Sequence, residues 1–424
     1  MATPAGYNQL MDIAVIGAGP AGIMAALRAA GGGARVTLFE HNPRVGRKLL
    51  VTGSGRCNLT NHGLNAAAYT VADQGWMNAF LAAFSPADLR QELDALGIPT
   101  FATPDGWVYP LSESAQSVVS ILEEALLQRQ VNLRVAINIT GFSHCITVFE
   151  LQIGPPGQHR TETFDALVVA AGGKAYPELG SRGELFPSLA RLGHTVNPLR
   201  PALGPIHARL GAYQLLKGLR FDVHAAILKG NRCLGETDGN LIVTEQGFNG
   251  PGVMNLSHWV ALEEPASLKL RLDFLGQKAS LFTGGMANRS RSQQSVQSYM
   301  SAFMAPKASD VFIRVAGLDP TLPLRDLTTR EVAALTAALQ QASFQVTGAG
   351  TFKDSQVTVG GVPVAEVDPT TCQSRLVPGL YLVGETLDVA GPCGGYNLHF
   401  AFGSGFLAGQ HLANSQVTQS KETA

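Results

Sequence analysis

The chain has 424 residues, of which 45% are hydrophobic and 15% are charged. This composition excludes a mostly disordered protein, and the length is sufficient for two or three domains with a large buried core. The 31 basic and 32 acidic residues give a net charge of -1, which argues against broad electrostatic binding to nucleic acid. We find no signal peptide and no apolar run long enough to cross a membrane, so we expect a cytoplasmic protein.

The cysteines are widely scattered along the chain. They are Cys57, Cys145, Cys233, Cys372 and Cys393. An odd number with no CxxC pair is not typical of a disulfide framework or of a zinc site. We therefore expect a reducing compartment and no metal centre.

The first motif is a strand, a glycine-rich turn, a helix and a second strand. The apolar run at 13–16 predicts a buried parallel strand, residues 23–30 have the composition of a helix, and residues 35–39 predict a strand that ends at Glu40. The turn between the first strand and the helix consists of Gly17, Ala18, Gly19, Pro20, Ala21 and Gly22.

Each glycine of this turn has a distinct physical role. Gly17 permits the tight turn, Gly19 lets the backbone approach a pyrophosphate, and Gly22 lets the helix pack against the strand. Amides at the start of the helix face the phosphates, assisted by the helix dipole. Glu40 can accept hydrogen bonds from a ribose diol and disfavours the 2'-phosphate of NADP at this position. The unit therefore predicts a dinucleotide-binding site.

A second polar segment, residues 46–61, suits contact with the remainder of an extended cofactor. Its cationic groups can neutralise pyrophosphate charge, and its glycine amides can reach a flavin ring. From composition alone, a solvated basic turn is the alternative. The residues of this segment that we predict to bind the cofactor are Arg47, Lys48, Thr52, Gly53, Gly55, Arg56, Cys57 and Asn58.

A third segment near the end of the chain predicts a short strand at 379–383 followed by a glycine-rich turn and a helix to about residue 412. The amino end of this helix can stabilise an anionic reduced flavin, and small residues at every fourth position predict close packing on a sheet. The alternative is a glycine-rich loop before an ordinary core helix. The predicted cofactor-binding residues are Gly384, Glu385, Asp388, Gly394, Gly395, Tyr396 and Asn397.

Two further residues are predicted to contact the cofactor from the middle of the amino-terminal half. The apolar run at 133–139 predicts a strand in which Ile139 contacts adenine through its backbone. The apolar run at 164–170 predicts another strand, which Gly172 follows.

Three blocks of sequence carry a family resemblance. They are residues 46–61, with Gly-Ser-Gly-Arg-Cys-Asn-Leu-Thr-Asn; residues 356–374, with Glu366 to Pro369 and Ser374; and residues 379–397, with Gly-Pro-Cys-Gly-Gly-Tyr-Asn. On these blocks the chain resembles the BaiN/RdsA-like (YhiN-like) family of NAD(P)/FAD-dependent oxidoreductases. Residues 171–177 read Ala-Gly-Gly-Lys-Ala-Tyr-Pro, where members often carry Thr-Gly-Gly, which indicates a divergent subgroup.

The resemblance implies an α/β fold: a Rossmann-like, doubly wound FAD-binding domain with an inserted β-barrel and a small helical subdomain. Short apolar runs between glycine and proline turns, and a helical pattern at 330–339, agree with it. The expected domains are residues 1–194 for the first part of the FAD domain, 195–280 for the barrel, 281–345 for the helical subdomain and 346–424 for the second part of the FAD domain.

The same resemblance implies reduction of an activated C=C bond. One branch of the family is tied to bile-acid reduction and another to the conversion of uridine to dihydrouridine in 23S ribosomal RNA. Our leading hypothesis is a conjugated C=C reductase with uridine in 23S rRNA as the first candidate substrate and NAD(P)H as electron donor. The alternatives are a small-molecule flavin reductase or dehydrogenase without an RNA role, and a non-catalytic flavin-binding redox protein. The sequence predicts no particular oligomeric state.

Cys57 and Cys393 are the candidate catalytic residues, because both lie in cofactor-directed motifs. A thiol near a helix start can have a lowered pKa and exchange a proton, whereas a buried cysteine often only fills space. We expect Tyr396 and Asn397 to position the flavin and His399 to lie in the core. Basic residues of the helical insert could face RNA or only aid solubility. They are Arg289, Arg291, Lys307, Arg314, Arg325 and Arg330.

Overall fold

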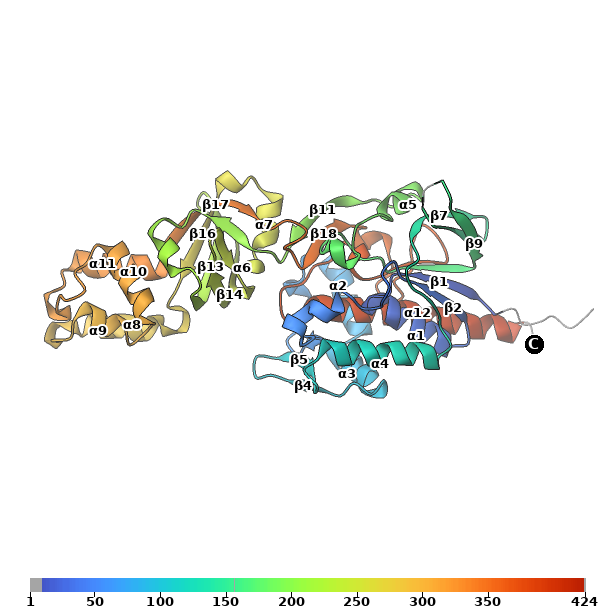
Figure 1. Cartoon of the computed structure of the whole chain (residues 1–424), viewed down its shortest axis with the longest axis horizontal. Coiled ribbons are helices and arrows are strands. Elements are labelled where there is room, and N and C mark those ends of the chain that lie inside the picture. Colours follow the sequence, from blue (N-terminus) through green and yellow to red (C-terminus); the bar gives the residue numbers. More distant parts are fainter. Residues whose placement is uncertain (1–9, 156, 423–424) are drawn as a thin grey trace, which may run out of the picture. The chain divides into compact units, whose positions relative to one another are not determined.

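The computed structural model describes residues 10–155 and 157–422 (Figure 1). The chain divides into two compact units. Unit 1 contains the residues up to Leu199 and those from Val357 onward, and unit 2 is Arg200–Gln356. The insertion predicted for residues 195–345 overlaps unit 2, whose two limits both lie further along the chain, and its division into two subdomains at residue 280 stays a prediction.

A five-stranded parallel sheet forms the centre of unit 1, in the order β19-β10-β1-β2-β6. Residues 13–15 at its middle are fully buried, as the uninterrupted apolar run predicts. The strands are β1 (Asp12–Ile16), β2 (Arg35–Phe39), β6 (Asn132–Arg134), β10 (Ala166–Val169) and β19 (Leu380–Leu382).

Helix α1 (Pro20–Gly31) follows β1 and lies beside the long helix α12 (Tyr396–Glu422) (Figure 1). The two helices approach each other closely, because a Cβ on Gly405 would overlap the carbonyl oxygen of Ala21, and a Cβ on Gly409 would lie 2.5 Å from that of Ala25. The small residues of α12 therefore do allow close packing, as predicted. Their nearest neighbours belong to helix α1, however, so the prediction that they pack on a sheet is wrong.

Gly405→Ala should therefore destabilise unit 1 by about 3 kcal/mol, because the added methyl meets backbone that cannot move independently. The free energy of unfolding from urea titration measures this loss. Gly284→Ala in helix α8 (Ala279–Ala287) of unit 2 is the matched control, since a Cβ there would meet no described atom within 4 Å. The control should gain up to about 1 kcal/mol from helix propensity. Equal stability of Gly405→Ala and the natural protein would contradict the observed helix contact.

Two short antiparallel sheets and further helices complete unit 1. One sheet has the order β3-β5-β4 and the other β7-β8-β9. Their strands are β3 (Thr60–Asn61), β4 (Thr100–Ala102), β5 (Trp107–Pro110), β7 (Ile139–Cys145), β8 (Val148–Ile153) and β9 (Arg160–Phe164). The helices are α2 (Gln74–Ala83), α3 (Pro86–Ala95), α4 (Ala115–Gln128) and α5 (Phe186–Arg191). The chain leaves unit 1 through β11 (Asn197–Ala202) and returns through β18 (Val357–Gly361).

Two predicted strands are each broken into two elements. The run at 133–139 is divided between β6 and β7, because Ala136 has a φ of 55° and the amides of Ala136 and Ile137 donate to the carbonyl oxygens of Asn42 and Glu40. The run at 164–170 is divided at Asp165, where β9 ends and β10 begins. In both places the expectation of one continuous strand is wrong.

Unit 2 contains a closed barrel in the order β12-β15-β14-β13-β16-β17, and the predicted fold class is confirmed. Its strands are β12 (Ile206–Ala208), β13 (Arg220–Lys229), β14 (Arg232–Val243), β15 (Gly247–Asn249), β16 (Leu268–Asp273) and β17 (Ala342–Ala349). Its helices are α6 (Pro251–Met254), α7 (Ser257–Leu262), α8 (Ala279–Ala287), α9 (Val296–Met300), α10 (Pro306–Ala316) and α11 (Thr329–Gln340). The last barrel strand, β17, crosses residue 345, where we predicted the end of the helical subdomain. The reason is that the helices are inserted between β16 and β17, before the barrel is complete. Over the described residues, no helix is both long and apolar enough to span a membrane.

Candidate cofactor and active site

The glycine turn lies at the carboxyl end of β1, where doubly wound sheets bind nucleotides. Gly17 has a φ of 102° and its amide donates to the carbonyl oxygen of Phe39 at 2.8 Å. A Cβ at Gly17 would overlap the carbonyl oxygen of Ala170, and one at Gly22 would overlap that of Gly17. The turn therefore excludes side chains at Gly17 and Gly22 because protein backbone already fills the space.

Gly19 differs from the other two glycines. It is the N-cap of α1, and a Cβ there would have no atom of the described residues within 4 Å. Pro20 lacks an N–H, and the remaining amides of the first turn have no acceptor within the helix. Open space in front of free amides fits a pyrophosphate at this position.

Glu40 is buried at the end of β2, with 9% of its surface exposed. Its Oε2 accepts from the amide of Ala18 at 2.8 Å, and its Oε1 accepts from the backbone and side-chain nitrogens of Asn42 at 2.8 and 2.7 Å. A carboxylate has about four acceptor positions, so capacity for a ribose hydroxyl remains. Asn42 also accepts from Arg47 at 2.8 Å, which ties the predicted pyrophosphate-binding arginine to Glu40.

The second polar segment is joined to the glycine turn. The amide of Gly46 donates to the carbonyl oxygen of Ala18 at 2.8 Å. The 3-10 segment η1 (Leu49–Gly55) follows, in which Gly53 and Gly55 have φ angles of 55° and 85°. The hydroxyl of Thr52 donates to the carbonyl oxygen of Leu49 at 2.7 Å. Both predicted glycines thus occupy left-handed positions, which a Cβ would disfavour.

Lys48 and Glu385 connect the amino-terminal and carboxy-terminal segments through an ion pair. The other carboxylate oxygen of Glu385 accepts from the amide of Thr358 at 3.0 Å. Gly172 lies beside this carboxylate, because a Cβ on it would be 4.0 Å from Oε2. The structure therefore brings three separately predicted residues together.

Asp388 is held by two residues of unit 1, one through its backbone and one through its side chain. Its two oxygens accept from the amide of Gly360 at 2.7 Å and from the side chain of Asn197 at 2.8 Å. The amide of Gly384 donates to the hydroxyl of Ser404 at 2.9 Å. These contacts explain how both residues are positioned, and their contact with a cofactor stays a prediction.

The turn before α12 rests on β3. The carbonyl oxygen of Gly394 accepts from Asn61 at 3.1 Å, and a Cβ on Gly395 would overlap the backbone of Thr60. The hydroxyl of Tyr396 donates to the carbonyl oxygen of Gly63 at 3.2 Å. Asn397 closes the turn on itself, with 2.8 Å bonds to both the amide and the carbonyl oxygen of Gly391. Residues 46–61 and 379–397 therefore meet at β3.

The remaining predicted cofactor residues have clear positions. Arg56 pairs with Glu113 at 2.6 Å and its guanidinium lies 4.4 Å from the ring centroid of Tyr109. Asn58 is buried, and its amide nitrogen can donate to the carbonyl oxygens of Thr60 and Val108 at 3.0 and 3.2 Å. Ile139 is buried at the start of β7. Contact of these three residues with a cofactor stays a prediction.

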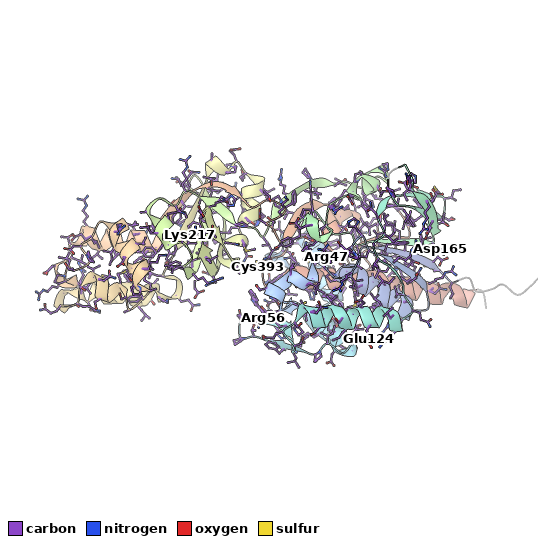
Figure 2. The ribbon with its side chains drawn as sticks, viewed as in Figure 1. Arg47, Arg56, Glu124, Asp165, Lys217 and Cys393 are labelled. Atoms are coloured by element: carbon purple, nitrogen blue, oxygen red, sulfur yellow. The ribbon has the colours of Figure 1, made fainter. Side chains whose placement is uncertain are left out.

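Cys57 and Cys393 both carry thiols whose pKa is raised, so the expectation of a lowered pKa is wrong. Cys57 is fully buried at a φ of 62°, and this burial raises its pKa to about 12. Cys393 is partly exposed in the turn before α12, and desolvation raises the pKa of its thiol as well. In both cases loss of hydration outweighs an opposing hydrogen bond, which involves Thr52 at Cys57 and the backbone at Cys393. Figure 2 shows Cys393, Arg47 and Arg56.

His399 is a buried core residue, as its pattern predicts. Its Nε2 faces the carbonyl oxygen of Phe84 at 3.2 Å and its Nδ1 faces the hydroxyl of Thr60 at 3.0 Å. Since a carbonyl only accepts, Nε2 carries the proton and Nδ1 accepts from Thr60. Burial lowers the pKa of His399 from 6.5 to about 4, although the carbonyl of Phe84 and the charge of Asp88 oppose the shift.

The lowered pKa of His399 makes the folded state less stable in acid. In mildly acidic solution this imidazole binds a proton in the unfolded chain but stays neutral in the folded chain. The stability that the neutral imidazole contributes to the folded state is complete above a pH of about 6.5. It is lost as the pH falls toward about 4. Between about pH 7 and about pH 5 we expect a loss of about 2 kcal/mol, measured by urea titration. His399→Gln should lose less over the same range. An equal slope in both proteins would contradict a buried neutral imidazole.

The basic residues of the helical insert make local contacts within unit 2. Arg289 donates to the carbonyl oxygen of Met286 at 3.0 Å, Lys307 donates to that of Lys217 at 3.2 Å, and Arg325 pairs with Asp326 at 3.6 Å. Arg314 and Arg330 are exposed. The side chain of Arg291 lies outside the described residues. An RNA-facing role for this set stays a prediction.

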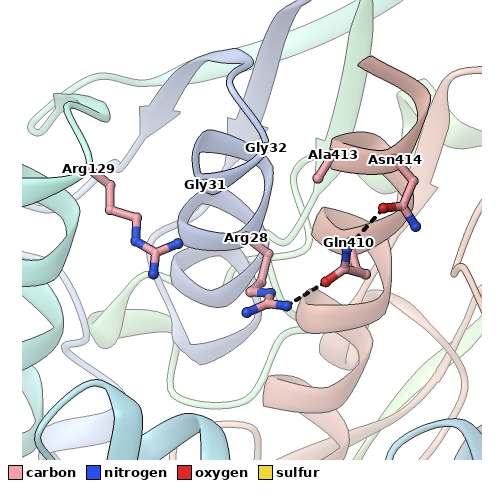
Figure 3. A pocket seen from close by; sticks show the side chains of 7 residues that line it. All are labelled: Arg28, Gly31, Gly32, Arg129, Gln410, Ala413 and Asn414. Carbon is pink, nitrogen blue, oxygen red and sulfur yellow. Dashed lines mark hydrogen bonds between the residues drawn. The ribbon is translucent and has the colours of Figure 1, made fainter. Parts of the chain in front are cut away.

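A cleft of about 210 Å³ lies at the carboxyl end of α1, opposite the glycine turn (Figure 3). Arg28 there pairs with Glu92 at 3.1 Å and with Gln410, while Arg129 donates to the carbonyl oxygen of Leu27 at 3.0 Å. Both arginines thus stabilise helix packing, and the cleft is separate from the predicted cofactor site. Nowhere in the described chain do three or more His, Cys, Asp or Glu side chains gather as metal ligands.

The sheet order, the glycine turn and the acid at the end of β2 define a Rossmann-type dinucleotide-binding domain. Together with the family and relatives given next, they place the protein among the flavoprotein oxidoreductases. The chain belongs to the HI0933-like protein Rossmann domain family, which matches residues 11–411. The family resemblance predicted from the sequence is thereby confirmed.

Two relatives span almost the same length as this chain. The 3-dehydro-bile acid delta(4,6)-reductase of Clostridium scindens is 32% identical over 408 residues, covering 95% of this chain and 98% of its own. A ribosomal RNA dihydrouridine synthase of Escherichia coli is 29% identical over 404 residues, with 95% and 98% covered. Among solved structures, the 3-ketosteroid delta1-dehydrogenase of Sterolibacterium denitrificans has a TM-score of 0.54 at 14% identity and covers 96% of this chain and 100% of its own. That likeness supports the fold alone.

Proposed function

We propose that this protein is an FAD-dependent reductase of C=C bonds conjugated to a carbonyl, with uridine in 23S rRNA as the first candidate substrate. The observation that carries the proposal is the meeting of residues 46–61 and 379–397 at β3, in the same unit as the glycine turn. Both relatives described above have names that denote or imply a reduced carbon–carbon double bond.

The residues present fit FAD from one end to the other. The amides at Gly19 would hold the pyrophosphate, Glu40 the ribose and Arg47 the phosphate charge. The η1 amides and the turn at Gly394 would hold the flavin ring, and the amino end of α12 would favour negative charge there. The remaining predicted positions would lie along the cofactor between these two ends, and the ion pair of Lys48 with Glu385 supports this arrangement because it links the two segments.

When bound and reduced, the flavin supplies a hydride to one carbon of the double bond. The neighbouring carbon then needs a proton. Cys393 is the proposed donor, because its raised pKa keeps the thiol protonated at neutral pH and its side chain is partly exposed. Cys57 is the second candidate, although full burial separates it from solvent. NAD(P)H is the proposed electron donor.

A small-molecule reductase without an RNA role is the second candidate function. The bile-acid reductase is slightly more similar, at 32% identity, than the ribosomal RNA enzyme, at 29%. The net charge of -1 also gives the chain no overall attraction to RNA.

Nucleoside mass spectrometry of 23S rRNA, from cells with and without the gene, tests the RNA substrate. We expect one dihydrouridine to be absent without the gene and restored when the gene is returned. Dihydrouridine that is unchanged in both strains would rule out the RNA substrate. Turnover of conjugated enones by the purified protein would then support the small-molecule alternative.

A further inference from the structure

Three aromatic side chains form a row on one face of the β3-β5-β4 sheet. Trp107 and Tyr109 are two residues apart on β5 and therefore face the same side, with ring centroids 6.4 Å apart. Phe101 is the cross-strand partner of Tyr109, with centroids 6.1 Å apart. We call Phe101, Tyr109 and Trp107 the aromatic row.

Both loops assigned to the flavin contact the aromatic row. A Cβ on Gly53 would lie 3.5 Å from the ring of Tyr109, and a Cβ on Gly394 would lie 3.2 Å from Cε2 and Nε1 of Trp107. Trp107 is also the cross-strand partner of Asn61, whose amide donates to Gly394. Trp107 therefore stands where the two loops meet.

The indole of Trp107 has surface and a hydrogen-bond donor that no contact of the described fold occupies. Its side chain is partly exposed, and its Nε1–H has no acceptor in the part of the chain that the structure describes. Trp76 provides the contrast, since it is 5% exposed and its Nε1 donates to the carbonyl oxygen of Val367 at 2.8 Å. An accessible ring with a spare donor suits a ligand that is flat and carries an acceptor.

We propose that Trp107 is a substrate-binding residue of the reductase. Its ring stacks on a flat C=C–C=O system within a ring of the substrate, and its Nε1–H donates to that carbonyl oxygen. This inference rests on the proposed function. Within the row, Tyr109 is held by the guanidinium of Arg56, which lies 4.4 Å from its ring centroid and pairs with Glu113 at 2.6 Å. A pyrimidine base and a steroid enone share this chemistry.

The test measures binding to the oxidised, FAD-loaded protein through the change in its flavin absorption spectrum. The probes are uridine 5'-monophosphate and testosterone. Trp107→Ala should raise the Kd of the binding probe at least about tenfold, because stacking is lost. Trp107→Phe keeps a ring but loses the donor, and should raise the Kd about threefold to fivefold. Trp259→Phe in unit 2 is the matched control and should bind as the natural protein does.

The outcomes separate this inference from the function on which it rests. Binding of only one probe identifies the source of the conjugated carbonyl system, as a nucleobase or as a small molecule. If the natural protein binds a probe and both Trp107 variants bind it equally well at unchanged FAD content, the proposed role of Trp107 is wrong. The proposed reductase function would not be affected by that result. Natural protein that binds neither probe would count against both. If Trp107→Ala does not fold, Trp107→Phe decides.

Discussion

Replacement of Gly19 by valine is expected to give a folded protein that binds FAD at least about 100-fold more weakly. The φ of -84° at Gly19 is open to any residue, and a Cβ would meet no described atom within 4 Å. The valine methyl groups would instead occupy the space proposed for the pyrophosphate. Visible flavin absorbance and circular dichroism, measured on the same preparation, separate loss of cofactor from loss of fold.

Gly22→Ala is the matched control for this experiment. Its Cβ would overlap the carbonyl oxygen of Gly17, so this variant should lose stability by about 3 kcal/mol or more, whether or not FAD is added. A Gly19→Val protein that retains a full complement of FAD would contradict the proposed position of the pyrophosphate.

Replacement of Cys393 by alanine is expected to lower kcat by about 100-fold or more while FAD stays bound. Removal of the thiol takes away the proposed proton donor, whereas neighbouring contacts of the turn, such as Asn61 with Gly394, remain. Because desolvation raises the pKa of this thiol, kcat in the natural protein should not fall as the pH rises through about 9.

Cys145→Ala, at an exposed position at the end of β7, is the control and should leave kcat unchanged. If Cys393→Ala turns over normally with full FAD content, its thiol only fills space. Cys57→Ala would then be the next variant to measure.

Local sequence patterns predict the first strand–turn–helix–strand motif well. The strands at 12–16 and 35–39 follow from apolar runs, and the roles of Gly17 and Gly22 follow from the chirality of the backbone and the need for close packing. By contrast, the break in the run at 133–139 depends on hydrogen bonds from residues 136 and 137 to the backbone of residues 40–42. No local pattern contains that tertiary contact.

In the candidate site, too, some features can be predicted from the sequence and others depend on the tertiary fold. Sequence blocks identify Lys48 and Glu385 separately, but their ion pair joins residues far apart in the chain and emerges only from the fold. Asn42 was missed, although a polar residue two positions after Glu40 is a usable signal. The raised thiol pKa values could not be predicted, because desolvation depends on how completely the surrounding elements cover Cys57 and Cys393.

Anaerobic reoxidation of the chemically reduced protein tests the central claim most directly. The reduced, FAD-loaded protein is mixed with a conjugated carbonyl compound, either testosterone or uridine 5'-monophosphate, and with the saturated analogue of each as control. We predict that a conjugated compound restores the oxidised flavin spectrum and yields one saturated product per flavin, while the saturated analogues leave the flavin reduced. A flavin that stays reduced with both conjugated compounds, and with 23S rRNA transcript, would contradict reduction of a conjugated C=C bond by this protein.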